Sequence, residues 1–173
     1  MNPDDEPVFR CARLLLLLDL VRERTANGVD VERLGIYDFF AAHPLLLVAE
    51  PADPDRTTLR LAGFDDRAIA YTGAGQRLVT TQQRLPADLT ALISSGLVEM
   101  IVDGRVRYRL TEPGQQAAAR LTAAYAHSYR LAARIVLKRL RRLSARKLRQ
   151  TVRSRTAALP DRPFPFSPSK DPT

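Results

Sequence analysis

Few residues in this sequence have the types and spacing that enzyme chemistry requires. The Gly-Ala-Gly stretch at 73–75 lacks the longer glycine spacing and the Lys followed by Ser or Thr of a phosphate-binding P-loop. His43 stands directly before Pro44, a position typical of helix capping or packing. His127 has no carboxylate within 14 residues on either side, so local spacing places no orienting acid beside it. We therefore expect a protein that is not an enzyme.

Cysteines and paired carboxylates indicate no metal or hydrolytic site either. Cys11 is the only cysteine, which excludes an intramolecular disulfide, and no Cys and His set has zinc spacing. Asp53 and Asp55 lie beside a proline and have the composition of a turn. Asp38 is expected either to pair with an arginine of the C-terminal segment or to face solvent. No cofactor or metal is predicted.

The strongest chemical signal is an uneven distribution of charge. The 173 residues carry 27 Lys and Arg against 19 Asp and Glu, a formal net charge of +8. Between Pro113 and Pro160 there are 12 Lys and Arg and no acid, so the rest of the chain holds 15 bases and all 19 acids. A basic C-terminal arm is typical of binding to a polyanion, an acidic protein or a membrane surface, and it also fits a merely solvated helical face.

Two groups of basic residues are candidates for nucleic-acid or polyanion contacts. The first group, at alternate positions of a predicted strand, comprises Arg105, Arg107 and Arg109. Alternation places these three on one face, where they can grip phosphates without reading base sequence. The second group, in the basic C-terminal segment, comprises Arg134, Lys138, Arg139, Arg141, Arg142, Arg146, Lys147 and Arg149.

The N-terminal sequence bears on location. Residues 4–6 are acidic, whereas a secretory signal needs a basic start and a small-residue cleavage site. The leucine run 14–18 is flanked by Arg13 and Asp19 and is shorter than the roughly 20 apolar residues that span a bilayer. We expect a cytoplasmic protein without a membrane partner, and its length fits one domain with appendages.

Apolar periodicity and breaker residues predict the elements that position these side chains. A helix is expected at 8–25, with leucines that suggest burial on two sides, and another at 31–43 after Asp30 as N-cap. The apolar stretch 45–48 fits a strand or a helical turn, and 50–57 is a loop by composition. Further helices are predicted at 76–84, at 86–95 with Pro86 in its first turn, at 112–129, at 126–143, and from Ser144 to about 157.

A β-hairpin is the clearest element of the sequence. Residues 97–102 and 105–110 are rich in β-prone side chains, and Asp103-Gly104 between them favours a two-residue turn with positive φ. The predicted organisation is a body of helices and hairpin (1–112), a basic helical arm (113–158) and a disordered proline-rich tail (159–173).

This order of elements is that of a winged-helix domain. We predict a mainly α fold with a small β-hairpin, in which a winged helix is followed by basic C-terminal helices. In the helix before the hairpin, Leu89, Leu92 and Ile93 are expected to face the core. Its expected exposed positions lack Lys and Arg, the commonest base-contacting residues: Ala87, Asp88, Thr90, Ala91, Ser94 and Ser95. A partner-binding winged helix is therefore at least as well supported as one that reads a DNA groove.

The sequence resembles the middle component proteins of ABC-three-component systems in three stretches. These are LGIYDFFAAHPL (34–45), ALISSGLVE (91–99) through LTEPGQ (110–115), and SARKLRQTV (144–152). The resemblance implies a non-catalytic winged-helix adaptor that links an SMC-like or ABC-type ATPase engaged on DNA to an effector of the same operon in defence against phage or plasmids. Within the first stretch, Tyr37, Asp38 and Phe39 are predicted to bind a partner. Segment 63–86 departs from the aromatic- and arginine-rich segment that the family has there.

Two alternatives to the adaptor remain at this point. The chain also fits a winged-helix transcriptional regulator that forms a homodimer through its terminal helices and binds double-stranded DNA at a symmetric site. The apolar stripe opposite the bases of helix 126–143 fits a helix that lies on a membrane surface, although the stripe lacks Trp and Phe and is more simply core.

Overall fold

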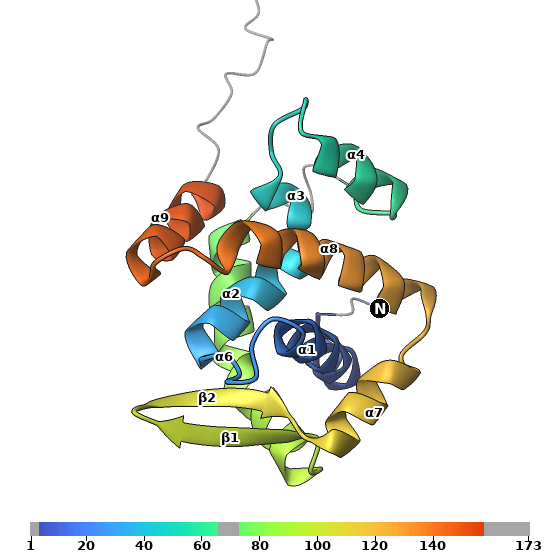
Figure 1. Cartoon of the computed structure of the whole chain (residues 1–173). Coiled ribbons are helices and arrows are strands. Elements are labelled where there is room, and N and C mark those ends of the chain that lie inside the picture. Colours follow the sequence, from blue (N-terminus) through green and yellow to red (C-terminus); the bar gives the residue numbers. More distant parts are fainter. Residues whose placement is uncertain (1–3, 66–72, 158–173) are drawn as a thin grey trace, which may run out of the picture.

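A computed structural model describes residues 4–65 and 73–157 of the chain (Figure 1). This part is mainly helical with a two-stranded antiparallel hairpin, as predicted. Its elements are α1 (Pro7–Arg22), α2 (Val31–Ala42), α3 (Pro44–Leu47), α4 (Pro54–Leu61), α6 (Ala74–Ser94), β1 (Val98–Asp103), β2 (Arg105–Leu110), α7 (Glu112–Arg120), α8 (Ala124–Leu140) and α9 (Ala145–Thr156). The predicted tail 159–173 lies outside the described residues.

Helix α1 lies in the middle of the fold and is buried on more than one side, as its leucines predicted. All six residues from Arg13 to Leu18 are buried, so no face of these one and a half turns meets solvent. Helices α2, α6, α7 and α8 and strand β2 all pack against α1 (Figure 1). Each fully buried leucine adds about 1.5–3 kcal/mol relative to an exposed one, so α1 is a large apolar contribution to the core.

The basic C-terminal segment also contributes to this core. Helix α8 lies across α1 and α2 (Figure 1), and it buries Tyr129, Val136 and Leu140 in the same apolar cluster as the α1 leucines. Leu148 of α9 joins the cluster. The segment predicted as an arm is thus packed on one side and charged on the other, as expected of an amphipathic surface helix.

Helix α4 occupies part of the stretch that composition predicted as a loop. The Asp53 side chain accepts a hydrogen bond from the backbone N–H of Asp55 at 3.0 Å, and Pro54 takes the first helical position. The residues that predicted a turn therefore begin a helix here, because an aspartate followed by proline is common both in turns and at helix N-termini. The stretch 45–48, left open between strand and turn, forms the short helix α3.

The predicted division of the helical region before Pro86 is wrong, since α6 runs through it without interruption. Proline lacks the N–H that would reach the carbonyl of Gln82. Gln82 and Pro86 are exposed, so water can reach that carbonyl, while Leu85 and Leu89 are buried in the core. Packing on both sides of the proline offsets the lost backbone bond.

The predicted helix 112–129 divides into α7 and α8, because the chain leaves the helical conformation at Leu121 with ψ of 91°. The Arg130 guanidinium donates to the carbonyl oxygens of Ala118 and Leu121, each at 2.7 Å. Arg130 thereby caps the end of α7, where the Ala118 oxygen also accepts from the backbone N–H of Leu121. The break lets α7 flank α1 while α8 turns back across it (Figure 1).

The hairpin is tighter than a two-residue turn and is tied to the chain between α1 and α2. Asp103 pairs with Arg105 around Gly104, whose φ is 65°. Val29 exchanges two backbone hydrogen bonds with Tyr108 of β2, at 3.0 and 2.8 Å. The neighbouring Gly28 has φ of 73°, and a Cβ there would lie 2.4 Å from the Tyr108 oxygen, so only glycine fits this close approach.

Candidate functional site

A pocket of about 400 Å³ opens between the end of α1, the segment that leads into α2, strand β2 and the end of α8. Five of the residues that line it are arginines, and we call it the arginine pocket: Arg24, Arg33, Arg105, Arg107 and Arg141. Val21, Val29 and Leu137 also line the pocket. The sequence predicted three of these arginines as polyanion contacts and missed Arg24 and Arg33.

Arg33 is the most firmly held of the five. Its guanidinium donates to the Tyr37 hydroxyl at 3.0 Å and to the Leu143 carbonyl at 2.7 Å. Asp30, which caps α2, lies 3.8 Å from the Arg33 Nε. Arg33 therefore connects α2 to the turn between α8 and α9, and its position is fixed before any ligand arrives.

The other pocket arginines lie on strand β2 and on the chain segments that follow α1 and α8. Backbone hydrogen bonds fix the position of β2 relative to the segment after α1. Alternation along β2 places Arg105 and Arg107 on one face of the strand. The paired bonds between Val29 and Tyr108 hold β2 against the segment that carries Arg24. Arg141 directly follows the last turn of α8.

Charge in the pocket is far from balanced. Within residues 4–65 and 73–157, no carboxylate lies within 4.0 Å of Arg24, Arg105, Arg107 or Arg141. Asp30 is the acid that lines the pocket, and its side chain already accepts from the backbone N–H of Arg33 at 2.9 Å. Guanidinium groups gathered in this way suit phosphate oxygens, which they can bind through two parallel hydrogen bonds.

A line of exposed bases follows α8 toward this pocket. Arg134, Lys138 and Arg142 are exposed at intervals of four residues, and we call them the basic stripe. Arg146 and Lys147 of α9 are exposed as well. In the part of the chain that the structure describes, none of these five has a carboxylate within 4.0 Å.

Three predicted polyanion contacts are instead neutralised within the fold. Arg109 pairs with Glu99 across the hairpin, and Arg149 pairs with Glu32 at 2.7 Å. Hydrogen bonding from Arg149 holds the pKa of Glu32 below its usual value.

Arg139 is the third of these, and it joins α8 to α4. Its guanidinium reaches both Asp53 and Asp55 at 2.7 Å, and its hydrogen bond lowers the pKa of Asp53. Sequence alone could not separate Arg139 from Lys138 beside it, because the two acids lie more than 80 residues away.

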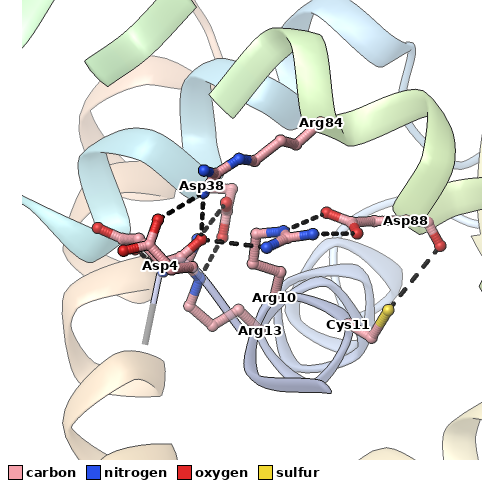
Figure 2. Close-up of polar contacts among 8 residues, drawn as sticks. Asp4, Arg10, Cys11, Arg13, Asp38, Arg84 and Asp88 are labelled. Atoms are coloured by element: carbon pink, nitrogen blue, oxygen red, sulfur yellow. Dashed lines mark hydrogen bonds and ion pairs between the residues drawn. The ribbon is translucent and has the colours of Figure 1, made fainter. Parts of the chain in front are cut away.

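The predicted partner-binding residues Tyr37, Asp38 and Phe39 are buried, with exposed fractions of 3%, 3% and 1%. The prediction that they form a docking surface is wrong, since their side chains belong to the core. The expected arrangement of Asp38 is wrong as well. Its carboxylate accepts from Arg13 of α1 at 3.0 and 3.1 Å (Figure 2). It also accepts from the Tyr129 hydroxyl of α8 at 2.7 Å.

Asp88 was expected to be exposed on the helix before the hairpin, and it is buried instead. Figure 2 shows Arg10 of α1 reaching both of its carboxylate oxygens, at 2.7 and 2.9 Å. Of the predicted apolar face of this helix, Leu89 and Leu92 are buried, while Ile93 is 38% exposed. The predicted exposure of Ala87, Thr90, Ala91, Ser94 and Ser95 is confirmed.

The internal ion pairs shift several ionisation equilibria. Burial on its own lowers the pKa of Arg13, but Asp38 and the other groups around it outweigh burial and raise that pKa overall. Burial raises the pKa of Tyr129, and the charge of Asp38 adds to this. Hydrogen bonding to His43 lowers the pKa of Asp4, and Arg13 contributes to the same effect. These groups are engaged in contacts within the fold, and Arg13, Asp38 and Tyr129 among them are buried.

The described residues contain no group of three or more His, Cys, Asp and Glu that could hold a metal ion. His43 lies 3.5 Å from Asp4, and His127 is exposed.

No helix in the described part of the chain combines the length and the apolar character that crossing a bilayer requires.

Comparisons with known proteins returned no match, whether the chain was compared with protein-family models, with curated proteins or with solved structures.

Proposed function

We propose that this protein is a non-catalytic winged-helix adaptor that docks on the phosphate backbone of double-stranded DNA. The order α1, Val29 bridge, α2, α6, β1, β2 supports the winged helix, with α3 and α4 inserted between the second and third helices. In this arrangement Val29 supplies the short first strand, and the hairpin is the wing.

The observation that carries the DNA proposal is the set of unneutralised bases. The basic stripe runs along α8, and its last residue, Arg142, directly follows Arg141 of the arginine pocket. In the last two turns of α6 (87–94), the exposed residues are alanine, threonine, isoleucine and serine, which do not make the arginine contacts typical of groove reading. Backbone contacts without base contacts give binding that depends on salt and not on sequence.

The adaptor role rests on the resemblance to the middle component proteins of ABC-three-component systems. It supplies the proposed partners, an SMC-like or ABC-type ATPase and an effector, and a cytoplasmic location. Since Tyr37, Asp38 and Phe39 are buried, the likeness of stretch 34–45 is a likeness of core residues. Partner contacts must then come from exposed surfaces elsewhere on the chain.

DNA binding is tested by fluorescence anisotropy at several salt concentrations. The labelled duplexes have either a random sequence or the sequence of the promoter of the gene that encodes this protein. We expect equal affinities for all duplexes and a steep fall with salt. R134Q/K138Q should reduce the slope of log K against log salt by about one for each phosphate contact that is lost. R22Q/R120Q removes the same charge from other helices and serves as the control. A promoter preference of about 1,000-fold or more would instead support a dimeric regulator.

The adaptor role is tested by co-expression with the neighbouring operon products. We expect the ATPase, the effector, or both to co-purify with this chain. A folded chain that retains neither product contradicts the adaptor role, even if DNA binding is observed.

A further inference from the structure

We propose that the arginine pocket is a binding site for a compact phosphate group with two or more negative charges, a phosphomonoester or a pyrophosphate. This site goes beyond the proposed function, because backbone docking needs only the singly charged phosphodiesters of a duplex. The two ligand sources with this chemistry are the phosphorylated end of a nucleic-acid strand and a free nucleotide.

The charge of the pocket favours a multiply charged anion. Five arginines and one aspartate line it, and the aspartate is engaged as the N-cap of α2. Like charges that converge on one hollow repel one another, and a single phosphodiester charge offsets little of this repulsion. A phosphomonoester or a pyrophosphate concentrates enough charge in one place to balance several guanidinium groups.

The shape of the pocket points in the same direction. Its volume of about 400 Å³ lies within the range of small-ligand sites, roughly 300–1,000 Å³. The pocket arginines come from α2, from β2 and from the residues that follow α1 and α8. A small anion can therefore be contacted on several sides. The aromatic residue in the pocket lining is Tyr37, and it is only 3% exposed. Recognition therefore rests on phosphate and not on stacking with a base.

The site is also arranged in advance of binding. Arg33 is held by the Tyr37 hydroxyl and the Leu143 carbonyl, and it retains further N–H donors. Gly28 and the Val29–Tyr108 bonds keep β2 at a fixed distance from the α1–α2 segment. Side chains that are ordered without ligand lose less entropy on binding, which favours affinity for a small anion.

Isothermal titration with pyrophosphate at constant ionic strength tests the proposal on the full chain, with sulfate as the reference anion. We expect pyrophosphate to bind more tightly than sulfate, and R107Q/R141Q to weaken pyrophosphate binding by about tenfold or more. R134Q/K138Q removes the same charge outside the pocket and should leave the affinity within about twofold. Because neither Arg107 nor Arg141 has a carboxylate within 4.0 Å in the described chain, both variants are expected to fold, which thermal melting verifies.

Equal binding of pyrophosphate and sulfate, or equal losses in the two variants, would overturn the proposal. Short duplexes with and without a 5′-phosphate, and a nucleoside diphosphate, separate the two sources. Tighter binding of the phosphorylated duplex assigns a strand end, and tight binding of the nucleoside diphosphate alone assigns a free nucleotide. Closed circular DNA has no strand ends. Binding to it without binding of pyrophosphate leaves the DNA proposal standing and overturns the phosphate site. Binding of pyrophosphate without binding of circular DNA overturns the DNA proposal and leaves the phosphate site standing.

Discussion

The arginines of α1 and the arginines of the pocket use one side chain in opposite ways. Arg13 is 2% exposed, and its guanidinium forms ion pairs with Asp38 and Asp4. The Tyr129 hydroxyl donates a hydrogen bond to the Asp38 carboxylate. Arg107 is half-buried and Arg141 is exposed, and no carboxylate of the described chain is within 4.0 Å of either. A buried charge requires a partner within the fold, whereas a solvated one can remain available for a ligand.

The largest effect is expected at the buried ion pair between Arg13 and Asp38. Asp38→Leu leaves the Arg13 guanidinium buried with Asp4 as its remaining carboxylate partner, and we expect a loss of about 3–5 kcal/mol in the free energy of unfolding. Urea denaturation measures this loss. The double variant R13M/D38L removes both charges and should recover most of the stability. A loss below about 1 kcal/mol in D38L would show that the pair is not needed in the core.

A smaller effect is expected where the backbone shapes the pocket. Gly28→Ala places a Cβ 2.4 Å from the Tyr108 oxygen in a residue with φ of 73°, so we expect a loss of about 1–3 kcal/mol and weaker pyrophosphate binding. Gly63→Ala is the matched control, because its φ is also positive, at 95°, but nothing lies within 4 Å of its Cβ. If both variants lose the same stability, the close approach of Gly28 to β2 does not matter.

Acid titration tests the N-terminal part of the buried network. The pKa of Asp4 in the folded protein lies below its unfolded value of about 3.9, because His43 and Arg13 bind its carboxylate. Its contribution to stability is therefore present above pH 4 and is lost as pH falls below that value. Asp4→Asn should lower stability at pH 7 and should reduce the dependence of stability on pH below 4, by up to about 1.4 kcal/mol per pH unit. Curves that stay parallel for the two proteins would contradict this.

The sequence predicted well what depends on neighbouring residues. The leucine-rich helix, the Asp30 cap of α2, the hairpin and the Ser144 cap of α9 all follow from periodicity and from local hydrogen-bonding residues. The α6 helix was predicted as two, because the cost of Pro86 is local, whereas the burial of Leu85 and Leu89 that offsets it is tertiary.

The charged sites were predicted poorly, because pairing is decided by residues far apart in the sequence. Asp38 and Asp88 are paired with arginines 25 and 78 residues away, and Arg24 and Arg33 join a pocket with β2 that no local pattern connects. One signal was present in the sequence. Arg13 directly precedes five leucines whose run covers every face of the helix, and an arginine in that position requires a buried acid.

The smallest expected effect is at the pocket itself, and it separates the two uses of arginine most directly. Arg107 and Arg141 line the pocket together with three other arginines, so replacing both by glutamine removes repulsion along with charge. We expect R107Q/R141Q to be as stable as the wild type or slightly more stable at low salt, with a change below about 0.5 kcal/mol that disappears at high salt. R22Q/R120Q, in which Arg22 loses its ion pair with Asp19, should show no such gain. A clear loss of stability in the pocket variant would mean that these arginines support the fold as Arg13 does, and the contrast between the two regions would not hold.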